Sequence, residues 1–192
     1  NCTFAGINQD AGANGYAIQV PSGSAEGTKL TVKGCDFDLA DLTFGIQLIG
    51  TAPEYQLHGC IFQNSGASLT HEIYYAGTAL VGSCGGHQVG RADAGAITAG
   101  ATVTMSNIAT DHLTLEGTAT TVNKIYPYWH GRTVYLYAET ANMTMSETTG
   151  AGSIRNIADE ASRVITGGDV AVYHYRGDSF RWHEIGGTTA PA

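Results

Sequence analysis

The sequence has little charge and lacks a long apolar run. Only 14% of its 192 residues are charged, and no segment approaches the ~18–20 consecutive apolar residues that a membrane-spanning helix needs. No charged segment followed by an apolar one opens the chain, as it would in a secretory signal. The sequence therefore predicts a soluble chain with no membrane insertion.

Basic residues are few and are scattered singly along the chain. Nine Lys and Arg stand against 17 Asp and Glu, which gives a formal net charge of −8. No basic run is present that could neutralise a series of phosphates. We therefore expect no nucleic acid partner.

Glycine and strand-forming residues dominate instead. The chain has 26 Gly together with many Thr, Val, Ile and Tyr, a composition that favours strands and tight turns over helices. A chain of this length can bury roughly 70% of its extended surface, so it can form one domain or two small ones. Because Asn1, not Met, opens the chain inside a repeated pattern, we expect a fragment or a processed product.

An internal repeat runs through the first half. Residues 30–37 (LTVKGCDF) match residues 55–62 (YQLHGCIF) position for position. Further shifts by nearly the same spacing extend the frame to 79–86 and then to 103–110, and residues 1–4 look like an earlier copy. A second series, at 18–20, 46–48 and 73–75, keeps step with the first. Two short strands per repeat are therefore expected.

A period of roughly 25 residues without a helical segment is typical of one coil of a parallel β-helix. Equivalent residues of successive coils stack ~4.8 Å apart. The sequence predicts an all-β fold in which residues 1–116 form the last coils of a right-handed parallel β-helix. Thr3, Asp36 and Ile61 are expected to point outward. Two inward ladders are expected, Cys2/Cys35/Cys60/Cys84 and Phe4/Phe37/Phe62.

The four cysteines are interpreted as buried free thiols of this ladder. No C-x2-C pair is present, and the histidines fall in no recognised metal-ligand spacing, so we expect neither a metal nor another cofactor. The alternative is a disulfide between adjacent coils, for example Cys35–Cys60.

After about Gly117 the period is lost, and antiparallel strands separated by glycine turns are expected over residues 117–192. The last two strands form a hairpin through Arg176-Gly177-Asp178, which we interpret as a turn and not as an adhesive motif. The expected strands are 120–125, 133–138, 142–145, 153–157, 163–165, 169–175 and 179–185.

The order of motifs in this second half resembles a known module. Gly131-Arg132 before an alternating strand, the run 168–175, and the closing strand 180–185 with Trp182 and Glu184 resemble the C-terminal module of phage tail spikes and related pectate-lyase-like β-helix proteins. In that family the module is a β-sandwich-like domain that helps three chains assemble. Two features depart from the family: the closing hairpin is long and Tyr-rich, and most of the helix that usually carries the active site is absent.

The resemblance implies attachment to bacterial surface polysaccharide, which many family members also hydrolyse or eliminate. Hydrolysis uses two carboxyl groups ~5–5.5 or ~6.5–9.5 Å apart. Glu54, Glu72, Asp36 and Asp38 are catalytic candidates, although Asp36 faces Ile61 in the next copy and Asp38 faces Gln63. For these four residues and for Asp41, we favour a role as solvated or turn-forming side chains over catalysis.

The aromatic segment 125–132 is the candidate carbohydrate-binding site. Exposed aromatic rings stack on sugars, and His and Arg supply hydrogen bonds, but the same side chains also serve subunit interfaces and cores. The candidate residues are Tyr126, Tyr128, Trp129, His130 and Arg132.

The leading functional hypothesis is therefore the end of a phage tail spike, a virion protein that forms a homotrimer and attaches to host polysaccharide. A polysaccharide depolymerase, with a site in or between the β-helix chains, is the first alternative. A secreted bacterial β-helix adhesin or lyase fragment is the second.

Overall fold

The structure is a computed structural model that divides the chain into two compact units, one of Asn1–Ala94 with Ser106–Thr110 and one of Gly95–Met105 with Asp111–Ala192. Each unit is described by itself. The described residues are 3–4, 15–21, 29–38, 43–49, 54–63, 71–76, 81–87, 96–98, 100–105, 107–117, 120–139, 141–157 and 160–188.

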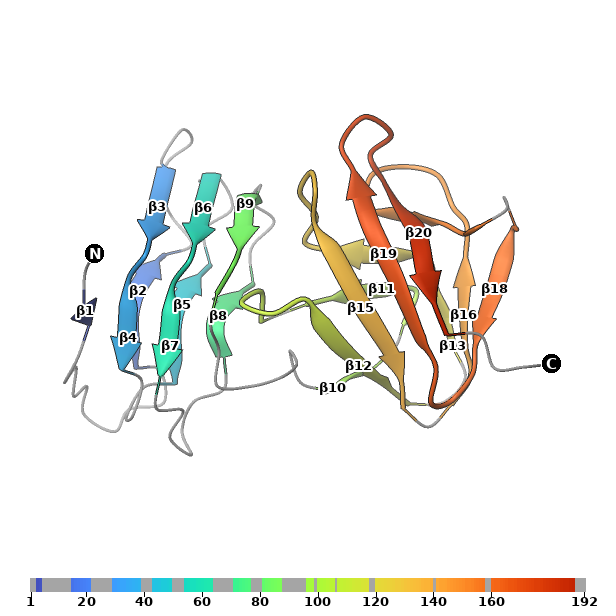
Figure 1. The fold of residues 1–192 in the computed structure, drawn as a ribbon, viewed down its shortest axis with the longest axis horizontal. Helices are drawn as coiled ribbons and strands as arrows, with labels where there is room; N and C mark the ends of the chain where they lie inside the picture. The colour runs from blue at the N-terminus through green and yellow to red at the C-terminus, as the bar shows by residue number, and fades with distance from the viewer. Residues whose placement is uncertain are drawn as a thin grey trace. The chain divides into compact units, whose positions relative to one another are not determined.

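The first unit is a parallel β-solenoid in which successive strands join three different sheets (Figure 1). One sheet contains β1 (Thr3–Phe4), β4 (Asp36–Asp38) and β7 (Ile61–Gln63). The second contains β2 (Tyr16–Val20), β5 (Phe44–Leu48) and β8 (His71–Tyr75). The third contains β3 (Lys29–Lys33), β6 (Glu54–His58) and β9 (Val81–Gly85). This arrangement confirms the right-handed parallel β-helix.

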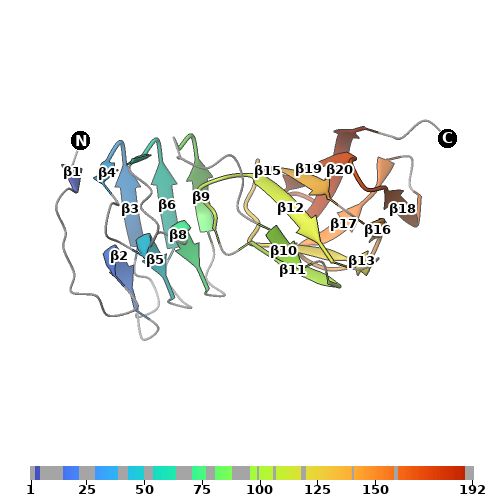
Figure 2. The ribbon, with the colours of Figure 1, turned by 90° about the horizontal axis from the view of Figure 1, so that it is seen from below.

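The strand registers confirm the first two series of the repeat. Leu30 pairs with Tyr55 and Asp36 with Ile61, at the spacing read from the sequence. In the second series Ile46 pairs with Ile18 on one side and with Ile73 on the other. Figure 2 shows these strands stacked side by side.

The phenylalanine ladder is confirmed for Phe37 and Phe62, whose side chains lie inside the coil. Phe4 pairs with Phe37, and Phe37 pairs with Phe62. The rings of Phe37 and Phe62 stack with centroids 4.9 Å apart, and both side chains are buried. Asp36 and Ile61 are half-buried on the opposite side of the strand.

The cysteine ladder is confirmed for two members and wrong for a third. Cys35 and Cys60 occupy equivalent positions just before β4 and β7, whereas Cys84 pairs with Leu57. A register shift between β6 and β9 moves the frame beyond the spacing inferred from the sequence. Cys35, Cys60 and Cys84 are buried free thiols, so the alternative disulfide does not form there, and Cys2 lies outside the described residues.

The proposed copy at 103–110 is also wrong. Val103 lies in β11 (Thr102–Thr104), which pairs with β14 (Lys124–Tyr126) of the second unit and not with β9. Ile108 donates its backbone N–H to Ile73 O at 3.0 Å. The match rested on a few isolated apolar positions, and any alternating strand can satisfy such a match.

The second unit contains one eight-stranded and one three-stranded sheet. The large sheet has the order β10 (Ala96–Thr98), β12 (His112–Glu116), β15 (Thr133–Ala138), β19 (Val170–Arg176), β20 (Arg181–Gly187), β17 (Ser153–Arg155), β14, β11. The small sheet has the order β13 (Thr120–Val122), β16 (Met143–Ser146), β18 (Ser162–Ile165). Both confirm an all-β second half.

Antiparallel pairing is confirmed for β14–β17, β15–β19, β16–β18 and β19–β20, but the sheets are mixed. Five pairs are parallel, namely β10–β12, β11–β14, β12–β15, β13–β16 and β17–β20, with Val103 beside Ile125 and Leu113 beside Leu136. Parallel pairing therefore continues past Gly117 at a shorter spacing, so the expectation of antiparallel strands alone is wrong. The sequence did not reveal this pairing, because the Cys and Phe residues that mark the earlier repeats no longer recur. The strands β14, β15 and β16 are each then followed by one reversed strand.

The core of the second unit lies beneath the large sheet. Trp182 and Tyr173 are fully buried, and the Trp182 indole donates to Ile125 O at 3.0 Å. Both belong to the last hairpin, which turns after Arg176 as the sequence predicted. No helix among the described residues is long and apolar enough to cross a membrane.

Candidate functional site

The structure divides the predicted carbohydrate-binding residues into buried and accessible groups. Trp129 and Arg132 are buried, with exposed fractions of 6% and 2%. Tyr126 and Tyr128 are half-buried, and His130 is exposed. His130 accepts the Gly177 N–H at 3.0 Å, which ties its loop to the turn of the last hairpin.

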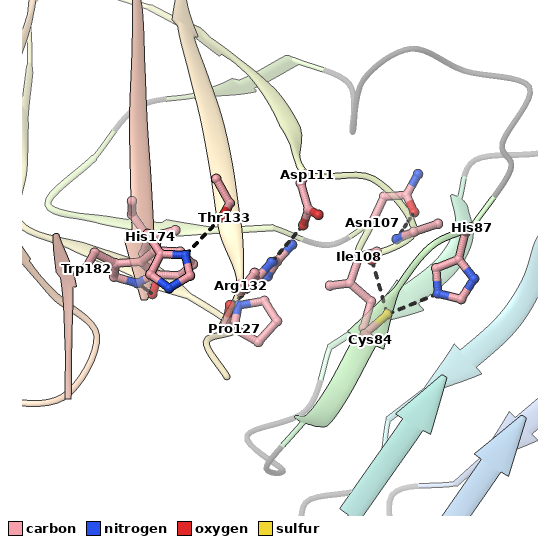
Figure 3. A network of polar contacts seen from close by, with 12 residues as sticks. Cys84, His87, Asn107, Ile108, Asp111, Pro127, Arg132, Thr133, His174 and Trp182 are labelled. Atoms are coloured by element: carbon pink, nitrogen blue, oxygen red, sulfur yellow. Dashed lines mark hydrogen bonds and ion pairs between the residues drawn. The ribbon is translucent and has the colours of Figure 1, made fainter. Parts of the chain in front are cut away.

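Arg132 is held by three contacts inside the second unit. Its Nη1 donates to Pro127 O at 2.6 Å, and its Nε donates to Asp111 Oδ1 at 3.0 Å (Figure 3). The guanidinium also lies 4.0 Å from the centre of the Trp129 ring. A cation–π contact and charge-assisted hydrogen bonds of this kind stabilise the loop. Arg132 and Trp129 therefore position the segment, and neither presents a face to a ligand in this conformation.

The two tyrosines of the segment belong to a series of ring contacts that ends at the buried Trp182. Tyr128 stacks on Tyr175 at 4.7 Å, and Tyr175 contacts Trp182 edge-on at 5.3 Å. Tyr126 lies 5.2 Å from Tyr128, and its hydroxyl donates to Ala151 O at 3.3 Å. Of the five predicted residues, Tyr126 and His130 therefore remain the best placed to meet a ligand.

The acidic candidates of the solenoid are held by neighbouring side chains. Glu54 forms an ion pair with Lys29 at 2.7 Å, and hydrogen bonds from Lys29 and Gln56 lower the pKa of its carboxyl. Glu72 is buried, and its Oε2 accepts from Asn107 Nδ2 at 2.6 Å. These contacts are structural: one links β3 to β6, and the other anchors residues 107–110 to β8.

The aspartate candidates lack an acidic partner on the next coil. Asp36 pairs in register with Ile61, and Asp38 pairs with Gln63. Asp38 is exposed and Asp36 is half-buried. Asp41 lies outside the described residues.

Sequence reasoning missed one in-register acid pair, Glu116 and Glu139. They follow Leu115 and Ala138, which are paired on β12 and β15. A hydrogen bond that protonated Glu116 donates to Glu139 is the main reason that the pKa of Glu116 is raised, followed by desolvation and by the charge of Glu139. Hydrogen-bonded carboxyls are closer than the ~5–5.5 Å of a retaining glycosidase, so the pair lacks that geometry. In the sequence, only the spacing between β12 and β15 could have indicated that Glu116 and Glu139 lie side by side.

Cys84 and His87 form a buried polar contact that resembles a catalytic Cys–His dyad. Its protons are placed differently from those of such a dyad. The Cys60 N–H donates to His87 Nδ1 at 3.2 Å, so the neutral ring carries its proton on Nε2. Nε2 lies 3.3 Å from Cys84 Sγ, and the thiol donates to Ile108 O at 3.4 Å (Figure 3). A general base would have to accept the thiol proton. This histidine instead donates to sulfur, which is a structural role.

His87 should make the stability of the solenoid depend on pH. Burial, followed by the nearby His58, lowers its pKa from 6.5 to about 4. The unfolded chain therefore binds more protons between these values, and stability present above pH 6.5 is lost as the pH falls. Between pH 7 and pH 5 we expect a loss of about 2 kcal/mol, measured by urea unfolding of the first unit.

The matched variants are His87→Gln, whose amide can still accept the Cys60 N–H, and His112→Gln, at an exposed residue of the second unit. His87→Gln should flatten the dependence, and His112→Gln should leave it unchanged. An equally steep dependence in His87→Gln would show that another group is responsible.

Exposed aromatic side chains occupy the outward face of β12 and β15. The rings of His112 and Tyr135 are stacked, with centroids 4.6 Å apart and planes 6° from parallel. Tyr135 and Tyr137 are each 39% exposed. We call His112, Tyr135 and Tyr137 the aromatic platform. The sequence showed the alternation of apolar and exposed residues along the strand at 133–138. It did not show that two strands would combine into one surface.

The strand registers also collect basic residues that are far apart in the sequence. Arg155 pairs with His183, and Arg181 pairs with Arg176. These residues lie on β17, β20 and β19, whose order in the sheet could not be read from residue spacing. The basic residues are thus scattered in sequence but gathered in the fold.

Comparisons with known proteins add no assignment: no protein-family model, curated protein or solved structure matches this chain.

Proposed function

We propose that the chain is the closing part of a phage tail-spike-like protein that forms a homotrimer and attaches to bacterial surface polysaccharide. The observation that carries the proposal is the aromatic platform, which lies on a β unit that follows a parallel β-solenoid in the chain. Flat, exposed rings suit the apolar faces of sugars, and tyrosine adds a polar tip for hydroxyl groups.

The order of the two folds supports an attachment role. A solenoid needs a terminal unit that covers its open strands, and such a unit offers a non-repetitive surface for recognition. The second unit supplies mixed sheets with reversed strands after the parallel ones. On this proposal the protein belongs to the virion tail and works outside the cell.

The proposal predicts three chains per particle in light scattering and binding to at least one polysaccharide of a panel of purified neutral and acidic bacterial surface polysaccharides. Tyr135→Ala and Tyr137→Ala should weaken that binding about tenfold, because each removes a ring that is already exposed. Thr121→Ala, at an exposed residue of β13, is the matched control.

A stable monomer that retained polysaccharide binding would favour the secreted bacterial adhesin. A monomer without such binding would end the proposal. Tyrosine variants that bound every polysaccharide as the wild type does would remove the aromatic platform from the site.

A further inference from the structure

Two rows of side chains cross the outward face of the large sheet. In the first row Arg155, His183 and His174 are successive register partners on β17, β20 and β19. Paired residues of adjacent strands point to the same face of a sheet. The intervening residues Trp182 and Tyr173 are buried, so this row faces away from the core.

The second row lies two residues along the same strands. Arg176 pairs with Arg181, and Arg181 pairs with Ser153, which is buried and in turn pairs with Lys124 on β14. Residues two apart on a strand share a face, so the rows are neighbours. We call Lys124, Arg155, His174, Arg176, Arg181 and His183 the basic face.

The basic face concentrates positive charge in an acidic protein. It contains four of the nine Lys and Arg residues of the chain. The turn beside it contributes Asp178, which forms an ion pair with Arg176 at 2.6 Å. Within about 8 Å, the screening length at physiological salt, nearby charges outweigh the net charge of −8.

His183 lies among the positively charged residues of the basic face. Burial lowers its pKa, and the charges of Arg176, Arg155 and Arg181 lower it further, while Asp178 acts in the opposite direction. Its Nε2 lies 2.8 Å from Ser179 Oγ, and that hydroxyl donates to Arg176 O. The ring therefore donates to Ser179 and is held in place among three guanidinium groups.

The aromatic platform continues the same surface. Thr133 of β15 is the register partner of His174, and Thr133 Oγ1 lies 3.0 Å from His174 Nδ1. Two residues further on, Tyr135 pairs with Val172 and faces the same way. A surface with cations beside a flat ring suits a ligand that has both an anionic group and a sugar face.

We propose that the basic face binds a carboxylate of an acidic surface glycan while the aromatic platform packs against a neighbouring sugar ring. This inference rests on the proposed attachment function and specifies its ligand as a uronic-acid saccharide. Arginine suits this task because its planar fork binds a carboxylate through two parallel hydrogen bonds. A short or locally acidic ligand is favoured over nucleic acid, because a long polyanion also meets the net negative charge of the protein.

Trigalacturonate and its fully methylated ester are the probes, because esterification removes the negative charges and leaves the sugar rings unchanged. By isothermal titration calorimetry of the full chain at low salt, trigalacturonate should bind at least tenfold more tightly than the ester. The double variant Arg155→Gln/Arg181→Gln should lose at least tenfold. Lys29→Gln/Lys33→Gln removes the same charge from β3 in the other unit and should bind as the wild type does.

Binding should also strengthen as the pH falls below 6.5, because the pKa of His183 is lowered and its ring gains a proton only there, while the ligand carboxylate stays ionised. The groups that face His183 are Arg155 of β17, His174 and Arg176 of β19, and Arg181, Asp178 and Ser179 from its own strand and turn. His183→Gln should reduce this dependence, and the NMR signals of its ring should shift on binding in the wild type.

The inference is overturned if trigalacturonate does not bind, if the ester binds equally well, or if folded Arg155→Gln/Arg181→Gln binds as the wild type does. Single-stranded DNA that competes at equal or higher affinity would assign the face to nucleic acid instead. A trimer that binds only neutral polysaccharides would sink this inference and leave the attachment function standing. A monomer that binds trigalacturonate through the basic face would sink the spike assignment alone.

Discussion

Arg163→Met should lower the free energy of unfolding of the second unit by about 3–5 kcal/mol. Arg163 forms an ion pair with Glu184, whose side chain is fully buried while that of Arg163 is 15% exposed. Removing the cation leaves a carboxylate inside the protein that has lost its hydration and no longer has a counter-charge. Urea or thermal unfolding, followed by the fluorescence of buried Trp182, measures the loss.

The second variant of this pair separates charge from packing. Arg163→Met/Glu184→Gln removes both charges, and the amide oxygen of the introduced glutamine can still accept the Ile157 N–H that Glu184 Oε2 accepts at 3.0 Å. We expect the double variant to recover most of the stability, because no unpaired ion remains. If both variants were equally unstable, the methylene packing of Arg163, and not its charge, would stabilise the unit.

Phe37→Ala should destabilise the solenoid by about 3–5 kcal/mol. Phe37 is fully buried and stacks on Phe62 of the next coil, so its removal leaves a cavity and breaks an inter-coil contact. Coils of a solenoid contact only their neighbours, and a gap in one therefore weakens the links on both sides. Chemical unfolding of the first unit, followed by circular dichroism, measures this loss.

Asp38→Ala is the matched control one position further along β4. Asp38 is exposed and pairs in register with Gln63, so its substitution should change stability by less than about 0.5 kcal/mol. Phe37→Leu should fall between the two, because it keeps apolar volume and loses the stacking. A loss in Asp38→Ala equal to that in Phe37→Ala would mean that the interior of the coil has been assigned to the wrong face.

The solenoid could be predicted because its repeat carries distinctive residues in equivalent positions. Cys35 and Cys60 with Phe37 and Phe62 define a register that the structure confirms. The frame failed at Cys84, where an irregular pairing of β6 and β9 changes the spacing. Spacing inferred from one clear pair cannot anticipate such a shift.

The candidate site could be predicted far less well. The aromatic segment was visible in the sequence, but the burial of Trp129 and Arg132 depends on Asp111 and Pro127, which no local pattern connects to them. The basic face was invisible, because its residues come from strands whose neighbours are set by tertiary pairing. Residue spacing predicts which residues pair in successive repeats. It does not predict which strands pair after the repeat ends.

The reversed strands of the second unit have a further consequence. β14, β15 and β16 are each followed in their sheets by one antiparallel strand, namely β17, β19 and β18. A stack of parallel strands presents an open edge on which another copy of the same strand can add, and such edges lead to fibres. A strand of opposite direction offers a different hydrogen-bonding pattern, on which the parallel register cannot be repeated. In the large sheet β20 joins the two reversed strands β17 and β19, so neither is left open, and in the small sheet β18 is a reversed edge strand on which the β13–β16 register cannot be extended.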